Sequence, residues 1–542
     1  MLHAPCSLTT ALFLPILVLL VASPLLPAHA APVARLVVVI SVDQLRNDRL
    51  TEDFPGGLGR LVRDGRRFPV SSVAHAITET CPGHAVIMTG MHPAGAGIPG
   101  NTYIERGNWR RRYCVDDDEP THEVLGGTGS RSPWMLRASG LGEWIRTAGV
   151  DSRVHALAGK DRAAIMLGGL RADGVLWFAP ELGAFTSSRY YTQALPEYVI
   201  AFNTGLLSRL PATWEHGPGH FRGDDFPGES KDNSRVSGHP LAAGKAAGRQ
   251  IQQSPFVDEL TLALAMQVVA EEQLGSGDGI DVLALSLSAN DTVGHLYGPF
   301  SAEVDDTLAR LDRELARFLD FLDSRIGVGR YVVALTADHG VTALPEYTLA
   351  RGASQCPVAG GRISHLDVAV RVYGRIYWRF TGPFHWPTSL VRIAGSQVYL
   401  NDDYMTAKGL DPEAVRSGVK AILEAVPGVR KAWTRSEIVS DVSEAARLLR
   451  HSLVPDRSGD LVVQLYPDCV LGSEGTSHGM FYPSDRFVPV LFFGAGVVPG
   501  QDWRPARSVD VAPSLAHLLG IPVPATLDGA VLDLAREPAA KP

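Results

Sequence analysis

Four apolar runs along the chain are each followed by a turn or a polar residue. They are Leu36–Val42, Ile280–Ser286, Tyr331–Thr336 and Phe487–Phe493. Strands that are apolar on both faces are typical of a parallel sheet that helices cover on both sides. Between the second and third runs, apolar residues recur at helical spacing from Val304 to Leu322, with charged residues on the opposite face. This alternation of strands and helices predicts an α/β fold.

Three regions lack this alternation and are rich in Gly, Pro, Trp and Tyr: residues 102–135, 180–250 and 345–475. We interpret them as insertions that cap the edge of the sheet. The sequence therefore predicts one large domain, residues 31–542, in which a mainly parallel sheet carries these capping insertions. The sequence shows no internal repeats.

The first thirty residues have the pattern of a signal peptide. An apolar run from Ala11 to Ala22 is followed by Ala28-His29-Ala30, which resembles a cleavage site. The run is short for a membrane span and Pro15 interrupts it. We therefore expect residues 1–30 to be removed on export, and the mature protein to be periplasmic or secreted without stable membrane association.

The composition excludes some classes of protein, and the cysteine count limits the possible disulfide pairings. The chain has 542 residues, of which 45% are apolar and 20% charged, and a formal net charge of -8. This balance excludes a disordered chain and gives no sign of a nucleic-acid-binding surface. The mature chain keeps Cys81, Cys114, Cys356 and Cys469, which allow three disulfide pairings. Cys81–Cys114 with Cys356–Cys469 is the pairing with the shorter loops.

Possible metal ligands follow the predicted strands. Asp43 follows the first run, Asp291 and His295 lie just beyond the second, and Asp338 and His339 follow the third. In open α/β sheets, ligands bind at the carboxyl ends of the strands. With His478, in a loop of small residues, these side chains supply six oxygen and nitrogen ligands of the kind that zinc accepts. Six ligands are enough for two zinc ions that could clamp an in-line displacement.

A hydroxyl group at a helix start could serve as the nucleophile. Pro82 fits the first turn of a helix and Gly90 fits its end, which places Thr80 at or just before the N-terminus. Backbone N–H groups and the helix dipole favour an anion there. We therefore predict that Thr80 attacks phosphorus and contacts a metal. We expect His75, His84 and His92 to be structural or surface residues, and Glu79 to be solvated.

These motifs together resemble the alkaline phosphatase superfamily, and more narrowly the exported bacterial monoesterases of the PafA type, which use a threonine nucleophile. The motifs that carry the resemblance are VDQLRND, TETCPGHAVIMTG, GIPGN, GKDR, SANDTVGHLYGP, TADHG, GTSHG and SVDVAPSLAHLLGIP. They run in order along nearly the whole mature chain. The resemblance implies a three-layer sandwich with helices on both faces of the central sheet.

The resemblance also implies the role of each site residue. One zinc ion would be held by Asp291, His295 and His478, and the other by Asp43, Asp338, His339 and the Thr80 oxygen. Asn101, Lys160 and Arg162 would bind the phosphoryl oxygens. The last two cations would distinguish monoesterases from the diesterase branch, and Asp161 between them would only orient them. We expect a monomeric phosphatase that hydrolyses small-molecule phosphate monoesters through a phosphothreonine intermediate.

Three other hypotheses remain open. A phosphodiesterase or nucleotide pyrophosphatase could use the same metal site; it would lack functional cations at Lys160 and Arg162 and would have an apolar or nucleoside-stacking pocket instead. A sulfatase would need a C-x-P-x-R setting, but Pro82 directly follows Cys81. An inactive binding or zinc-storage protein would be indifferent to loss of Thr80.

Overall fold

A computed structural model describes residues 1, 34–215, 227–230, 238–241, 247–382 and 385–541. Apart from Met1, the expected signal peptide lies outside these ranges. Within them, the helices are all too short or too polar to cross a bilayer.

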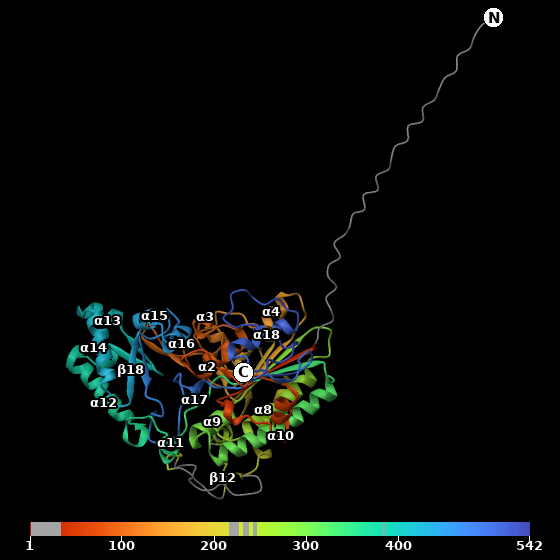
Figure 1. The fold of residues 1–542 in the computed structure, drawn as a ribbon, viewed down its shortest axis with the longest axis horizontal. Coiled ribbons are helices and arrows are strands. Elements are labelled where there is room, and N and C mark those ends of the chain that lie inside the picture. Colours follow the sequence, from red (N-terminus) through yellow and green to blue (C-terminus); the bar gives the residue numbers. More distant parts are fainter. Residues whose placement is uncertain (2–33, 216–226, 231–237, 242–246, 383–384, 542) are drawn as a thin grey trace.

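A nine-stranded sheet forms the centre of the molecule (Figure 1). Its strands, in spatial order, are β10 (Ala184–Thr186), β9 (Gly174–Ala179), β8 (Val154–Ala158), β13 (Asp281–Leu287), β1 (Leu36–Val42), β14 (Tyr331–Thr336), β21 (Val490–Gly494), β2 (Arg66–Arg67) and β22 (Gly500–Gln501). The consecutive strands from β9 to β14 are all parallel. The expectation of a mainly parallel sheet is therefore confirmed.

Alternate residues of the central strands point to opposite faces of this sheet and enter two separate cores. In β1, Val37 and Val39 belong to one core, whereas Val38 and Ile40 belong to the other. The first core is covered by α2 (Thr80–Thr89), α4 (Leu141–Thr147), α5 (Asp161–Gly168) and α18 (Val511–Leu518). The second is covered by α1 (Gly57–Asp64), α8 (Phe256–Glu271), α9 (Ala289–Tyr297) and α10 (Ala302–Arg325). This is the three-layer α/β sandwich that the sequence predicted.

The fourth apolar run behaves differently from the other three. It forms β21, but this strand begins only at Val490 and runs antiparallel to β14. Burial on both faces produced the continuous apolar pattern, and that pattern carries no information about strand direction. Our interpretation of this run as a further parallel strand was wrong.

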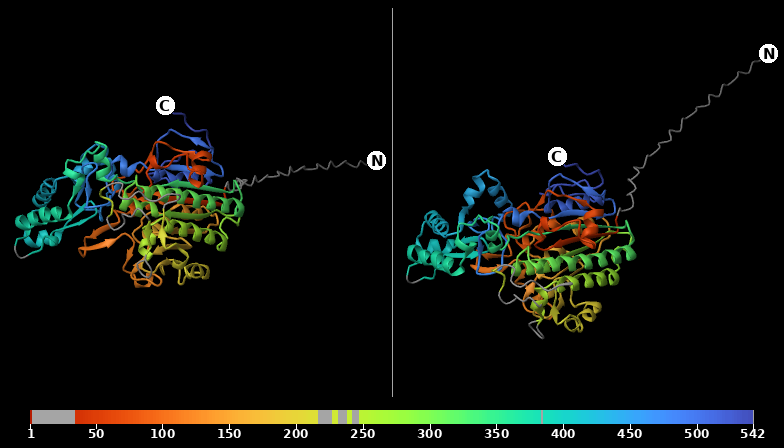
Figure 2. Two further views of the ribbon diagram at one scale, coloured as in Figure 1. Left: turned by 90° about the horizontal axis from the view of Figure 1, so that it is seen from below. Right: turned by 60° about the horizontal axis from the view of Figure 1, so that its bottom comes forward.

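Residues 362–471, which we call the cap lobe, stand beside the sandwich (Figures 1 and 2). A four-stranded sheet runs through it in the order β16 (Val391–Ala394), β17 (Gln397–Leu400), β19 (Leu461–Leu465) and β18 (Val429–Thr434). Helices α12 (His365–Ile376) and α14 (Pro412–Glu424) pack on one face of this sheet around a core of their own. The lobe therefore has regular secondary structure that we did not predict from its Gly- and Pro-rich sequence.

Two disulfides tie the chain together, Cys81–Cys114 and Cys356–Cys469. Of the three pairings that the sequence left open, the structure forms the one with the shorter loops. Cys114 directly follows β5 (Arg110–Tyr113), a strand of the region 102–135. The first bridge therefore attaches that strand to the start of α2.

Candidate metal centre and active site

Strand register brings the predicted ligands to one edge of the sheet. β1 lies between β13 and β14, with Val42 opposite Leu287 and Ser41 opposite Thr336. Because parallel strands in register end at the same edge, the residues that follow them converge there. The structure brings the ligand candidates Asp43, Asp291, His295, Asp338, His339 and His478 together, the last from a loop beyond the cap lobe.

The first ligand group consists of Asp43, Asp338 and His339, all fully buried. The His339 Nε2 atom lies 3.2 Å from Asp338 Oδ2 and 3.6 Å from Asp43 Oδ1. None of these three atoms has a hydrogen-bond partner. Since the His339 Nδ1–H donates to the Gly340 carbonyl at 3.0 Å, its Nε2 presents a lone pair. Three buried lone-pair atoms facing one another repel unless a cation lies between them, so this group fits a divalent metal ion.

The second ligand group consists of Asp291, His295 and His478. Asp291 Oδ1 lies 3.2 Å from the His295 Nε2 atom and 3.5 Å from the His478 Nε2 atom, and the two Nε2 atoms are 3.2 Å apart. Each imidazole donates its Nδ1–H to a backbone carbonyl, of Thr476 for His295 and of Thr78 for His478. Such bonds fix the ring and leave Nε2 for a metal. His339 is also within ligand reach of Asp291 and His478, so it lies between the two groups.

Burial and the close packing of charged groups shift several pKa values at the site. Burial, together with the nearby charges of Asp291 and Asp338, raises the pKa of the Asp43 carboxyl to about 6. Burial lowers the pKa of His478, but the hydrogen bond and charge of Asp291 outweigh burial and raise this pKa to about 9. Burial and then the charge of His478 hold the pKa of His339 well below its usual range. Metal binding would therefore compete with a proton at His478.

Lys160 lies directly against both ligand groups. Its ammonium nitrogen is 2.5 Å from Asp43 Oδ2 and also bonds to Asp291. Burial lowers the pKa of Lys160, but the two carboxylates more than compensate and the net shift is upward. The residue thus stays charged at the centre of the cluster, where we expected a cation for phosphoryl oxygens.

Thr80 is the first residue of α2 and is buried beside this cluster. The Arg162 guanidinium donates to its Oγ1 atom at 3.5 Å. The Asn101 Oδ1 atom accepts the Cys81 backbone N–H at 2.8 Å, which leaves the Asn101 amide nitrogen as the donor that this side chain can offer a ligand. The hydroxyl therefore lies among donors suited to an anion at a helix N-terminus.

Sequence reasoning suggested that Asp161 orients Arg162 but missed Tyr113 and Arg131, which complete this network. The Arg162 guanidinium donates to the Tyr113 hydroxyl oxygen at 3.2 Å, and that hydroxyl donates to Asp161 Oδ1 at 2.6 Å. Arg131 also donates to Asp161. Tyr113 precedes Cys114, which is bonded to Cys81 next to Thr80. Knowledge of that disulfide could have pointed to this tyrosine.

Three other residues support the site: Glu79 and His84, to which we gave no role, and Gln44, which we overlooked. Glu79, which we expected to be solvated, is half-buried, and its Oε2 atom accepts the Asn101 N–H at 2.6 Å. Gln44 donates from its backbone to Asp338 and from its side chain to Asp291. His84 is buried, as are His75 and His92, and it bonds the Thr80 carbonyl and the Ser286 hydroxyl. In each case the signal in the sequence was only proximity to a candidate residue.

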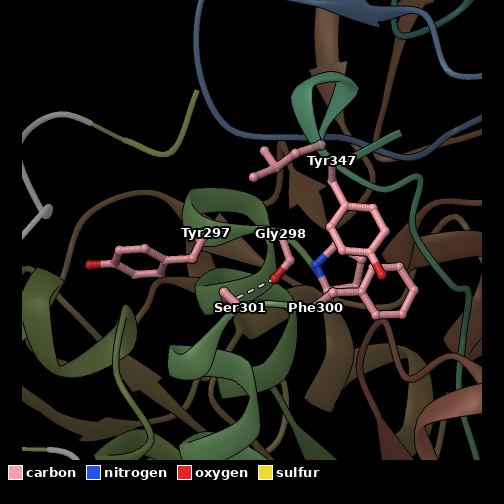
Figure 3. Close-up of a pocket in the computed structure, with 7 residues that line it drawn as sticks. Tyr297, Gly298, Phe300, Ser301 and Tyr347 are labelled. Atoms are coloured by element: carbon pink, nitrogen blue, oxygen red, sulfur yellow. Dashed lines mark hydrogen bonds between the residues drawn. The ribbon is translucent and has the colours of Figure 1, made fainter. Parts of the chain in front are cut away.

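A small hollow lies where α9 ends (Figure 3). There Phe300 stacks on Tyr347 with ring centroids 4.7 Å apart, and Tyr297 points away from that pair. Tyr347 belongs to α11 (Pro345–Ala350). The hollow has no room for a water-sized molecule. It is a packing contact that fixes the end of the helix bearing Asp291 and His295.

Comparison with known proteins agrees with this geometry. Residues 37–478 match the family described as type I phosphodiesterase / nucleotide pyrophosphatase. The chain is 34% identical to alkaline phosphatase PhoK of Sphingomonas sp, over 93% of this chain and 92% of that protein. It is 29% identical to alkaline phosphatase PafA of Elizabethkingia meningoseptica, over 92% and 93%. A crystal structure of wild-type PafA superposes with a TM-score of 0.84 at 27% identity, covering 93% of this chain and 99% of that one.

Proposed function

Because this chain belongs to the type I phosphodiesterase / nucleotide pyrophosphatase family, as a PafA-like member of the alkaline phosphatase superfamily, we propose that it hydrolyses phosphate monoesters through a phosphothreonine at Thr80. Family membership makes it a hydrolase of phosphate esters. The observation that carries the finer assignment is the Arg162 guanidinium 3.5 Å from the Thr80 hydroxyl, at the edge of two clustered ligand groups.

The two ligand groups fit one divalent cation each. Asp43, Asp338 and His339 would hold one ion, and Asp291, His295 and His478 the other. Mixed nitrogen and oxygen ligands favour zinc. When bound, such cations neutralise phosphoryl charge and lower the pKa of a coordinated hydroxyl or water.

Residues of this chain then carry out hydrolysis in two successive displacements at phosphorus. Thr80 Oγ1 attacks phosphorus while the ester P–O bond breaks, and the alcohol leaves. A water molecule next attacks the phosphothreonine, which releases phosphate and restores the Thr80 hydroxyl. Arg162, Lys160 and the Asn101 amide bind the equatorial phosphoryl oxygens, where charge is greatest in the transition state.

We propose that this enzyme acts outside the cytoplasm after removal of residues 1–30. The two disulfides support export, because such bonds persist in oxidising compartments. We also retain the hypothesis that the mature enzyme is a monomer acting on small-molecule monoesters.

Relative rates on two esters of one leaving group test the monoesterase assignment. We expect kcat/KM for 4-nitrophenyl phosphate to exceed that for methyl 4-nitrophenyl phosphate by about 100-fold or more. Arg162→Ala should lower the monoester value by about 100-fold and the diester value by less than about 10-fold, since a diester presents one charged oxygen fewer. Arg110→Ala, an exposed cation on β5, is the control and should change neither value. Equal losses on both esters in Arg162→Ala would contradict the proposal.

A phosphodiesterase remains the second candidate because one observation favours it. A cavity of about 460 Å³ with a mainly aliphatic wall adjoins the site, and an apolar pocket is what we expected of a diesterase. The buried cation Lys160 and the half-buried cation Arg162 argue against a diesterase. Faster hydrolysis of the diester in the same assay would establish this alternative.

Tyr113 should position Arg162 without touching substrate. Tyr113→Phe removes both the acceptor for Arg162 and the donor to Asp161. Loss of one such contact is worth about 1–1.5 kcal/mol, so we expect a fall of roughly 10-fold in kcat/KM for the monoester. The diester rate, which depends less on Arg162, should fall less. A general structural defect would instead lower both rates together and reduce the melting temperature.

A further inference from the structure

The cap lobe is incompletely filled next to the active site. A cavity of about 460 Å³ lies between the half-buried side of its sheet and helices α12 and α14. Along β19, Leu461, Val463 and Leu465 share one face, and the last two are half-buried and line the cavity. Val368 and Val372 on α12 form the opposite wall. Its size falls within the range of small-molecule sites.

One end of this cavity is the active site itself. Its lining includes Asn101, His295 and His478, together with Glu79 beside Thr80. A group that leaves from a phosphorus atom at Thr80 would therefore have the cavity as its neighbour.

The walls of the cavity are aliphatic. Its apolar lining consists of Val, Leu and Ile side chains with Met480 and the disulfide-bonded Cys469, and the described residues that line it include no Lys, Arg, Phe, Tyr or Trp. Its two carboxylates lie among internal donors: Glu79 accepts the Asn101 N–H, and Asp485 accepts the Thr342 hydroxyl and the Met480 N–H. Such walls remove hydrocarbon from water but offer no Phe, Tyr or Trp ring on which a nucleobase could stack, and the imidazoles of His295 and His478 belong to the ligand group at the active-site end.

We propose that this cavity binds the hydrocarbon part of the leaving alcohol, so that aliphatic phosphate monoesters are the preferred substrates. The inference rests on the proposed function, since it needs phosphorus held at Thr80. Each methylene group that enters the cavity should increase kcat/KM about three- to four-fold, because its burial contributes to transition-state binding. From methyl to hexyl phosphate, five methylene groups are added, so we expect an overall increase of about 250- to 1,000-fold.

A series of n-alkyl phosphates tests the proposal. The leaving alcohols have closely similar acidity, so intrinsic reactivity is nearly constant and kcat/KM reports burial of the chain. Methyl, butyl, hexyl and dodecyl phosphate are compared below their micellar concentrations. A rise that ends near hexyl supports a small alcohol as the leaving group, whereas a rise that continues to dodecyl supports a lipid chain. If kcat/KM does not change from methyl to dodecyl phosphate, the proposal is wrong.

Two valines on one helix provide the matched variants. Val368 lines the cavity, whereas Val370 is 63% exposed on the outer side of α12. In Val368→Asp the hexyl-to-methyl ratio of kcat/KM should fall by about 10-fold or more, and in Val370→Asp it should stay as in the wild type. If Val368→Asp fails to fold, Val463→Phe fills the cavity with an apolar ring and should lower the same ratio. Equal ratios in the cavity variants and Val370→Asp overturn the proposal.

The same assays show whether the cavity proposal alone is wrong or whether the proposed function is wrong as well. A flat alkyl series combined with Thr80-dependent hydrolysis of methyl phosphate removes only the cavity proposal. Absence of Thr80-dependent hydrolysis from every monoester removes the proposed function, and the cavity proposal with it.

Discussion

Thr80→Ala is expected to lower kcat for 4-nitrophenyl phosphate by at least about 10³-fold while leaving the fold and the metal content unchanged. Removal of a nucleophile abolishes the covalent route, and the remaining site can do little more than bind the ester. Alanine suits the first turn of a helix, so α2 should form as before. Steady-state rates and metal content are measured on the same samples.

Thr89→Ala is the matched control for this variant. Thr89 lies at the other end of α2, is buried, and donates its hydroxyl to the Ala85 carbonyl at 2.7 Å. Its loss should leave kcat within about threefold of the wild type, since nothing at the site contacts it. If Thr80→Ala kept more than a tenth of the wild-type rate, the phosphothreonine route would be wrong, and direct attack of water on the ester would be the better explanation.

Removal of metal by a chelator should abolish activity and lower the melting temperature of the wild type by several degrees. A ligand that binds only the folded chain stabilises it by about 2.7 kcal/mol at a hundred times its dissociation constant. Zinc should restore both properties to the wild type. It should not restore activity to Asp338→Asn, because one of the unpartnered ligand atoms, Asp338 Oδ2, has become an amide nitrogen.

The sign of the stability change distinguishes a metal site from an ordinary buried carboxylate. Without metal, Asp43→Asn should melt above the wild type, because it can place an amide donor where the unpartnered Asp43 Oδ1 faces His339 Nε2, and it keeps an oxygen for Lys160. With metal it should melt below the wild type. Asp502→Asn breaks the fully buried pair with Arg66 and should melt lower in both conditions. Destabilisation of Asp43→Asn without metal would contradict the assignment.

The apolar runs predicted the central strands because a strand buried on both faces leaves a continuous signal in the sequence. The runs at Leu36 and Tyr331 became adjacent parallel strands, and the amphipathic repeat from Val304 became α10. The direction of β21 could not be predicted, because side-chain burial is the same in either orientation. Residues 345–475 were predicted to be a capping insertion, but the helices and strands of the cap lobe were not, because its strands are short and only Val372 and Ile376 of α12 are buried, which weakens the alternation of apolar and polar residues.

Residue type and position in the chain were enough to identify the ligand candidates, since few side chains suit a divalent cation and the ends of buried strands mark where they gather. Their convergence and orientation were decided by tertiary structure. The partners of His478 and Arg162 lie far from them in the chain: Thr78 and Tyr113 reach them only through folding. The aliphatic cavity likewise joins segments that are distant in sequence. The sequence by itself thus determined which chemical groups this protein has, and the tertiary structure decided which of them meet, because hydrogen bonds and cavities depend on distances that linear spacing does not define.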